Sequence, residues 1–523
     1  MAVPLLALAS FTGVLLSGWL SDRFERRKFE RRKPLVIAPV HRERDAAGAQ
    51  RRAGDPDQAR ATSRVGRAGE EVLINTIDIA LPSGGGRVRG RRESGVARFL
   101  GIPYAAAPVG PLRFAAPAPP PRWEGVRDAT APGPWAPQLP EPKESVLPRT
   151  VVSGDDYLNL NVWTRDVDGR APVMVFIHGG SLVIGSGALP VSDGTAFARD
   201  GVVLVTINYR LGADGFLWTG EGVPNRGLLD QIAALEWVRE NIAAFGGDAA
   251  NVTIFGESAG AMSVMALATM PRAAGLFRRV IAESGAGEHV TDEATALLAA
   301  KRLARRLGVA PTLAGVAAVP MPDLLAAVGA LTVDVTSRPF AHRWKDAARL
   351  LLPFAPFADG DVVPGLPRDL ILAGAAHDVD LMIGTTTDEA RLFFVPTGAI
   401  DRLPRVFPWL FATRYGGRAT RVRASYRRRR GLCSSGDLAA AVLTDGFFRV
   451  PALRLAAAHP RAFVYEFAWR SPEFGGRLGA CHGVELPFVF DTLGKSGLEG
   501  ITGDAPPQAL ATEVHAAWVA FAT

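Results

Sequence analysis

The chain has 523 residues, of which 48% are hydrophobic and 21% are charged, a composition typical of a globular protein with a sizeable core. Its two cysteines, Cys433 and Cys481, are too few for a disulfide framework, and we interpret them as isolated buried thiols. The net charge is +7, but residues 1–70 alone carry +6, so the rest of the chain is almost neutral. This distribution argues against a nucleic-acid partner for the main body of the chain.

An N-terminal extension covers residues 1–71. Residues 2–20 are apolar and uncharged, and this segment is about long enough to span a bilayer. The basic residues follow the apolar segment, whereas a secretory signal places them before it, and the positive-inside rule would keep the following chain cytoplasmic. We therefore expect a cytoplasmic protein in which only residues 2–20 could contact a membrane. Residues 41–70 are rich in Arg, Ala, Gly and Asp, which predicts a disordered linker.

Part of the extension is similar to a transporter loop. Residues 18–23 read G-W-L-S-D-R and are followed by Arg26-Arg27-Lys28. This pattern resembles the loop after the second helix of major facilitator transporters, over about thirty residues. One span is not a transporter, so the resemblance implies no transport function. The extension can be a true anchor, a fusion scar or the product of a start codon placed too far upstream, and we favour the last two interpretations.

The main body, which we expect to form one domain over residues 72–523, alternates strand and helix patterns. Residues 72–79 and 87–100 predict an early antiparallel ribbon, and residues 228–242 have the spacing of a helix. Further strands are predicted at residues 159–163, 173–177, 202–207, 252–255, 280–282, 379–383 and 463–467. This alternation predicts an α/β fold with a mostly parallel, doubly wound sheet. Residues 287–375 and 395–460 are expected to be helical and to pack around the sheet and over the site.

The stretch Asn251–Gly260, N-V-T-I-F-G-E-S-A-G, carries the strongest chemical signal. A short apolar strand ends at a tight turn in which Gly256 and Gly260 flank Ser258, and an Ala/Met-rich helix follows. Strand, strained turn and helix form the nucleophile elbow, which exposes the serine hydroxyl next to a helix N-terminus. The five-residue motif is weak by itself, and its strand and helix context is what makes Ser258 a candidate nucleophile.

A serine nucleophile needs a base, which is usually a histidine oriented by a carboxylate. In hydrolases with this elbow, the acid and then the histidine follow the serine along the chain. Three histidines lie late enough. We interpret His459 and His515 as surface or packing residues of helices, whereas His482 lies in a Gly-rich loop, 475–483, where an exposed imidazole could reach Ser258.

Two carboxylates follow the strand at residues 379–383. From chemistry alone either Asp388 or Glu389 could orient the base, and both could also be ordinary acids at a helix N-terminus. The oxyanion hole is predicted at Ile177–Ser181, I-H-G-G-S, because glycines allow backbone N–H groups to approach a substrate oxygen closely.

Together these residues carry a family resemblance. Residues 72–523 resemble type-B carboxylesterases, which have the α/β-hydrolase fold. The matching stretches are F-L-G-I-P-Y-A (99–105), P-V-G-P-L-R-F (108–114), L-N-V-W-T (160–164), I-H-G-G-S (177–181), N-Y-R-L-G (208–212), G-L-L-D-Q (227–231), N-V-T-I-F-G-E-S-A-G (251–260), G-T-T-T-D-E-A (384–390) and H-G-V-E-L-P-F-V-F (482–490).

The resemblance implies a role for each matching position. It selects Glu389 as the acid and implies oxyanion donors at Gly180, Ser181 and Ala259. It also implies that Glu257 and Ser284 help to order the site, and that no cofactor or metal is needed. The expected activity is hydrolysis of a small-molecule carboxylic ester through an acyl-enzyme. The alternatives are a non-catalytic binding or adhesion member of the same fold, and an inactive truncated or chimeric product.

The chain departs from the family pattern at three places. Ser181 stands where the family has a third glycine, which a backbone donor should tolerate. Ala136 and Tyr157 stand near the positions of an early disulfide found in many members, which suits a reducing compartment or a bacterial protein. The chain ends at Thr523, where the family usually continues for a few dozen residues, so we expect a short C-terminus.

Overall fold

The computed structural model describes residues 35–37, 75–140, 145–147, 149–337, 341–404, 424–426, 428 and 434–523. The predicted apolar segment 2–20, the predicted linker 41–70, Cys433 and most of the run Arg427–Arg430 lie outside these residues. Within the described ranges, no helix is both long enough and apolar enough to cross a bilayer.

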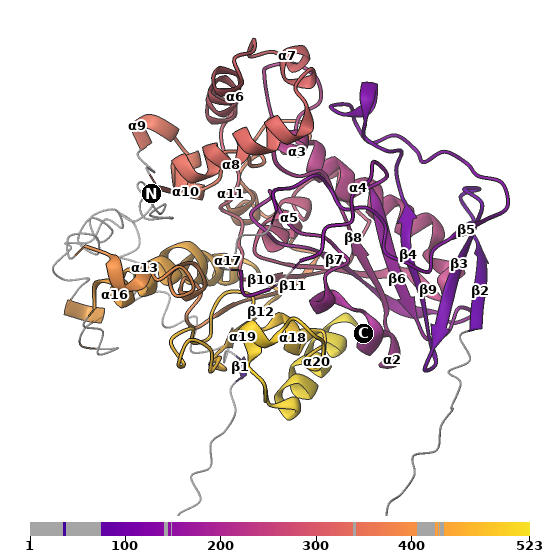
Figure 1. Cartoon of the computed structure of the whole chain (residues 1–523). Helices are drawn as coiled ribbons and strands as arrows, with labels where there is room; N and C mark the ends of the chain where they lie inside the picture. Colours follow the sequence, from indigo (N-terminus) through magenta and orange to yellow (C-terminus); the bar gives the residue numbers. More distant parts are fainter. Residues whose placement is uncertain are drawn as a thin grey trace, which may run out of the picture.

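A mixed sheet runs through the molecule in the order β1-β12-β11-β10-β9-β7-β8-β6-β4-β3-β2, with β5 paired to β3 (Figure 1). The pairs from β8 through β7, β9, β10 and β11 to β12 and β1 are parallel, and those from β2 through β3, β4 and β6 to β8 are antiparallel. The strands are β1 (Leu35–Ile37), β2 (Asn75–Ala80), β3 (Arg87–Glu93), β4 (Val96–Pro103), β5 (Val126–Asp128), β6 (Asn159–Thr164), β7 (Ala171–Ile177), β8 (Val203–Ile207), β9 (Gly247–Glu257), β10 (Arg279–Glu283), β11 (Asp380–Thr386) and β12 (Ala462–Phe467).

The central strands are buried on both faces because their apolar side chains alternate between two cores. On β7, Val173 and Val175 join one hydrophobic cluster while Met174 and Phe176 join the other. The same alternation separates Ile254 from Phe255 on β9. Successive side chains of a strand point to opposite faces, so a continuous apolar run requires helices on both sides of the sheet.

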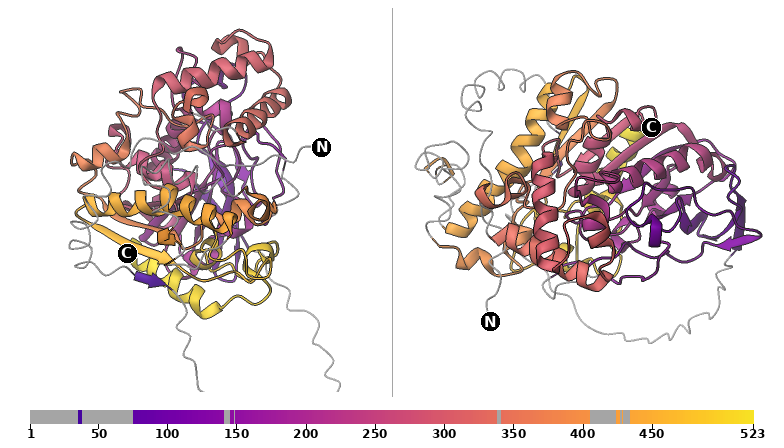
Figure 2. Two further views of the ribbon diagram at one scale, coloured as in Figure 1. Left: turned by 90° about the vertical axis from the view of Figure 1, so that its left-hand side faces the viewer. Right: turned by 90° about the horizontal axis from the view of Figure 1, so that it is seen from above.

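Helices supply both layers, as the views in Figure 2 show. Helices α4, α5 and α17 pack on one face of the sheet, and α2, α18 and α20 cover the other. The helices are α2 (Thr195–Arg199), α3 (Gly212–Phe216), α4 (Arg226–Asn241), α5 (Ala259–Leu267), α6 (Glu293–Leu307), α7 (Leu313–Ala317), α8 (Met321–Ser337), α9 (Ala341–Trp344), α10 (Ala347–Leu350), α11 (Pro367–Leu372), α12 (Arg391–Phe394), α13 (Ala399–Arg402), α16 (Ser435–Leu443), α17 (Val450–Ala458), α18 (Leu486–Val489), α19 (Glu499–Thr502) and α20 (Gln508–Ala522). A π-helical turn, Thr444–Arg449, joins α16 to α17.

These bounds confirm the predicted α/β architecture, including the antiparallel ribbon, the helix near residues 228–242 and the helix-rich stretches. Two strands were not predicted: Val126–Asp128, which pairs in parallel with β3, and Leu35–Ile37. Leu35–Ile37, inside the N-terminal extension, pairs in parallel with Tyr465–Phe467 of β12. Three apolar residues among basic ones carry no periodicity that could have indicated this pairing.

Candidate active site

Five loops bring the predicted site residues together because they all follow the carboxyl ends of neighbouring parallel strands. Strand β7 leads into the oxyanion turn, β9 into Ser258 and β10 into Ser284. Strand β11 leads into the turn that carries Glu389, and β12 leads into the loop that carries His482. In open α/β sheets this edge is where ligands bind.

Ser258 occupies a strained turn between β9 and α5. Its φ is 58° and its ψ is −119°, a conformation that is costly for a residue with a side chain. The Ser258 N–H donates to Glu283 O at 2.9 Å, which ties the turn to β10. A Cβ on Gly260 would lie 1.9 Å from Ile177 O, so only glycine lets α5 begin this close to the end of β7.

The predicted oxyanion turn lies against this elbow. A Cβ on Gly179 would come within 3.1 Å of Ser258 Cβ, which measures how closely the two turns approach. Gly180 has a φ of 103°, and its carbonyl accepts hydrogen bonds from Val183 N and Ile184 N at 3.1 Å each. Within the described residues, the backbone N–H groups of Gly180, Ser181 and Ala259 donate no hydrogen bond to protein. They are therefore free to receive an oxygen atom of a ligand.

His482 and Glu389 form a short, buried pair. The Nδ1 atom of His482 lies 2.6 Å from Glu389 Oε2, and Thr386 N donates to Glu389 Oε1 at 2.8 Å. The sequence predicted an exposed imidazole at this position. This prediction is wrong, because His482 is only 5% exposed. The rings of Phe393 and Phe448 cover it, with ring centroids 5.4 and 4.9 Å away.

The other ring nitrogen of His482 faces Glu257 rather than Ser258. Nε2 lies 3.0 Å from Glu257 Oε1, and no hydrogen bond joins Ser258 Oγ to His482 in the described part of the chain. Glu257 immediately precedes Ser258 in the sequence, so the imidazole lies against the residue next to the candidate nucleophile. Catalytic hydrogen bonds are often long or misaligned before substrate binds.

Chemistry alone could not decide whether Asp388 or Glu389 orients the base, and the structure gives these two carboxylates different partners. Glu389 is fully buried and contacts His482. The Asp388 carboxylate turns away from the imidazole and bonds to Arg470 and to the backbone N–H of Ala480.

The remaining late histidines lie elsewhere. His459 and His515 are each 2% exposed, so the surface interpretation of these two residues is wrong and the packing interpretation is confirmed. His515 Nδ1 bonds to Val489 O at 2.7 Å, and His459 Nε2 bonds to Ala376 O at 2.8 Å. Cys481 is a free, buried thiol, and burial raises its pKa well above the ordinary value.

Sequence reasoning missed two buried acids beneath the site. Glu283 accepts a hydrogen bond from Trp518 Nε1 at 2.8 Å, and Glu485 accepts one from Ser284 Oγ at 3.2 Å. Burial raises the pKa of Glu283 to about 8, and burial together with the nearby glutamates raises that of Glu485 well above its usual range. In both residues burial thus favours the neutral carboxylic acid. Glu485 lies one turn after His482 in the stretch H-G-V-E, but nothing in that stretch shows its burial.

The pKa of His482 reflects two opposing effects. Burial lowers it, but the carboxylates of Glu257 and Glu389 outweigh burial and raise the pKa well above its ordinary value. The two neighbouring carboxylates thus favour the protonated imidazole in the ligand-free protein.

We expect Glu257→Gln to shift the pH profile of esterase activity. Removing one of the two carboxylates lowers the pKa of His482, and a general base must be neutral to act, so the acidic limb of kcat/KM should move to lower pH. At about pH 6 the variant should keep roughly threefold more of its own maximal kcat/KM than the unaltered protein. The measurement is a pH profile of both proteins with one ester. An acidic limb that stays in place, or moves to higher pH, would contradict this role of Glu257.

Among the described residues, no group of three or more His, Cys, Asp or Glu side chains could hold a metal ion. The features gathered at this edge of the sheet are a strained serine elbow, a buried His–Glu pair and three unused backbone donors. The sheet order and the elbow define an α/β-hydrolase fold.

Comparisons with known proteins agree with this class. The sequence pattern that defines the carboxylesterase family matches residues 75–523 of this chain. The chain is 40% identical over 460 residues to the para-nitrobenzyl esterase of Bacillus subtilis, covering 84% of this chain and 88% of that protein. It is 38% identical over 456 residues to the phenmedipham hydrolase of Pseudarthrobacter oxydans, covering 83% and 88%. A solved carboxylesterase of Geobacillus stearothermophilus is 36% identical and superposes with a TM-score of 0.72 over 85% of this chain and 90% of that chain. The chain belongs to the carboxylesterase family and is a carboxylic ester hydrolase.

Proposed function

We propose that this hydrolase cleaves small-molecule carboxylic esters through an acyl-enzyme on Ser258, with His482 as the base and Glu389 as the acid. The observation that supports the proposal is that the strained elbow at Ser258, the buried His482–Glu389 pair and the three free N–H groups all follow the carboxyl ends of neighbouring strands. A serine hydroxyl is a weak nucleophile, and this arrangement supplies both a base to activate it and donors for the developing oxyanion.

In acylation, His482 accepts the Ser258 proton as Oγ attacks the ester carbonyl carbon. The N–H groups of Gly180, Ser181 and Ala259 stabilise the oxyanion, and Glu389 stabilises the imidazolium. His482 then gives its proton to the leaving alcohol as the C–O bond breaks. A water molecule repeats the sequence on the acyl-enzyme, releases the acid and restores Ser258.

Glu257 and Ser284 order the site in this proposal. Glu257 holds the imidazolium until substrate arrives, and Ser284 bonds to the buried Glu485 below the elbow. The mechanism uses an ester as its substrate and calls on no cofactor, metal or nucleic acid. A membrane contact through residues 2–20 and a cytoplasmic location stay predictions, and the transporter-like stretch at residues 18–28 has no part in the proposed reaction.

Labelling with a fluorophosphonate probe tests the assignment. The full chain should be modified on Ser258, as shown by peptide mapping, and His482→Ala should react at least about a hundredfold more slowly because its serine lacks a base. A folded sample that is not labelled, or a label on another residue, would contradict the proposed nucleophile. Labelling at full rate in His482→Ala would contradict the proposed base.

A further inference from the structure

Asp388 joins the two segments that carry the acid and the base. We call residues Thr386–Ala390, which include Glu389, the acid turn, and residues Leu478–His482 the histidine loop. The Asp388 N–H donates to Ala480 O at 2.8 Å, and the Ala480 N–H donates to Asp388 Oδ2 at 3.3 Å. The side chain thus supplies the acceptor that a backbone carbonyl would supply in a strand ladder.

The histidine loop has little regular structure to hold it in place. It follows Gly475 and Gly476, both with positive φ, and Gly479 forms an isolated bridge to Ser471. Two residues beyond Ala480, the His482 N–H donates to Glu389 O at 3.2 Å. The bonds at Ala480 and His482 fix the register of the loop against the acid turn, and this register sets the distance from His482 Nδ1 to Glu389 Oε2.

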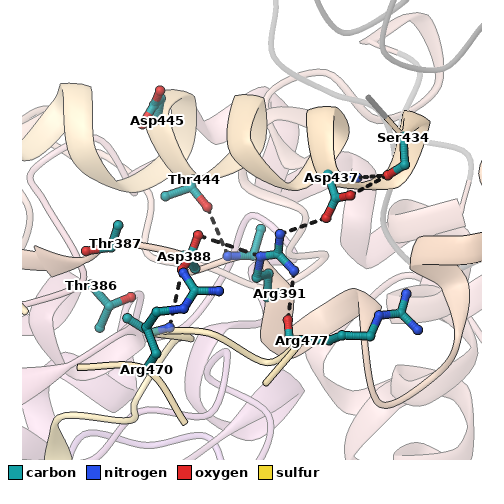
Figure 3. Close-up of polar contacts among 12 residues, drawn as sticks. Thr386, Thr387, Asp388, Arg391, Ser434, Asp437, Thr444, Asp445, Arg470 and Arg477 are labelled. Atoms are coloured by element: carbon teal, nitrogen blue, oxygen red, sulfur yellow. Dashed lines mark hydrogen bonds and ion pairs between the residues drawn. The ribbon is translucent and has the colours of Figure 1, made fainter. Parts of the chain in front are cut away.

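Basic side chains hold the Asp388 carboxylate in position. Arg470 Nη1 lies 3.0 Å from Oδ2, and Arg391 Nε lies 3.6 Å from Oδ1. Arg391 also donates to Arg477 O and to Asp437 Oδ1 on α16, at 2.7 Å each. Figure 3 shows Asp388 lying between the Arg391 and Arg470 guanidinium groups, with Arg391 extending to Asp437.

The acid turn is held from its other side by the π-helical turn. Thr444 Oγ1 accepts a hydrogen bond from Ala390 N at 3.1 Å, and Arg449 donates to Thr386 O and Thr387 O at 3.2 and 2.8 Å. The acid turn is therefore fixed in place independently of Asp388. In the histidine loop, the bond from Ala480 N–H needs the Asp388 side chain, so loss of this side chain should displace the base more than the acid.

We propose that Asp388 is a positioning residue that fixes the histidine loop against the acid turn and so holds His482 in line with Glu389. This inference rests on the proposed function, in which these two residues act together. A displacement of about 1 Å in a catalytic group can cost about a hundredfold in rate. Asp388 should therefore affect kcat more than KM, although it contacts neither substrate nor the imidazole.

The test compares Asp388→Ala with Asp388→Asn in the full chain. Alanine removes the acceptor for Ala480 N, so kcat for 4-nitrophenyl acetate should fall by about tenfold or more while KM changes by less than about threefold. Asparagine keeps an acceptor oxygen and loses only the ion pairs, so its kcat should stay within about threefold of the unaltered value. Rates are expressed per fluorophosphonate-reactive site, which removes any contribution from unfolded protein.

Asp437→Ala is the matched control. It removes the other carboxylate on Arg391 but leaves the bonds between Asp388 and Ala480, so its kcat should change by less than about twofold. Gly479→Ala should act like Asp388→Ala, because its Cβ would lie 2.6 Å from Asp388 Oδ2.

Three outcomes would overturn the inference: an unchanged kcat in Asp388→Ala, equal losses in the alanine and asparagine variants, or an equal loss in Asp437→Ala. A failure of the proposed function would look different, because the unaltered protein itself would then hydrolyse the ester without needing Ser258 or His482.

Discussion

Replacing Ser258 with alanine should lower kcat/KM for 4-nitrophenyl acetate by about 10⁴-fold or more, while the protein stays folded. The loss is large because the remaining groups can bind and polarise an ester but cannot form the acyl-enzyme. Stability should change little, since no hydrogen bond from Ser258 Oγ to another described residue is lost and the elbow is held by the backbone bond to Glu283 O. Steady-state kinetics and a thermal melt of both proteins check these expectations.

Ser192→Ala is the matched control for this change. Ser192 is buried, and its hydroxyl donates to Gly187 O at 3.1 Å, far along the chain from the elbow. This variant can lose some stability but should keep kcat/KM within about twofold, because its hydroxyl bonds only to backbone carbonyls within its own turn. Ester turnover that survives in Ser258→Ala would assign the nucleophile elsewhere.

Gly180→Ala should lower kcat/KM by about 10²- to 10³-fold through loss of the oxyanion hole. An alanine Cβ at this position would lie 2.1 Å from Ile184 O, and a φ of 103° is unfavourable for any residue with a side chain. The clash is with backbone, so the turn itself must move. This movement should displace the N–H groups of Gly180 and Ser181 from positions where they can donate to the oxyanion. The main loss should be in kcat, because these donors act mostly on charge that develops in the transition state.

Ser181→Gly provides the contrast at the next residue. Ser181 is exposed and adopts a φ of 56°, which glycine accepts without strain, and the substitution keeps the backbone N–H. We expect kcat/KM within about threefold of the unaltered value and no decrease in melting temperature. If Gly180→Ala were as active as Ser181→Gly, the oxyanion would have to be bound by other donors.

The burial of several glutamates near His482 limits how many of them can carry a charge. Two buried glutamates, Glu257 and Glu389, contact His482, and two more are buried close to them, so four negative charges beside one positive charge would be costly to bury. Burial raises the pKa of Glu283 and Glu485 and so favours their neutral forms, whereas the carboxylates of Glu257 and Glu389 raise the pKa of His482. Each of these two acids also accepts a hydrogen bond, Glu283 from Trp518 and Glu485 from Ser284.

The sequence by itself determined most of the strands, the α/β class and the candidate residues for the site. These features are local: the apolar run before Ser258, the glycines around it and the D-E pair after a strand are patterns within a few residues. From chemistry alone, Asp388 and Glu389 could not be separated, and only the resemblance to a family selected Glu389.

The tertiary structure decided everything that depends on residues far apart in the chain. It turned Asp388 toward Ala480 and Glu389 toward His482, it buried an imidazole that the Gly-rich loop suggested was exposed, and it placed Glu257 within reach of His482 Nε2. It also gathered Glu283 and Glu485 below the elbow and paired Leu35–Ile37 with β12. Burial and pairing across more than ninety positions are set by how the strands align and what packs over their ends. No periodicity within a short stretch of sequence records that information.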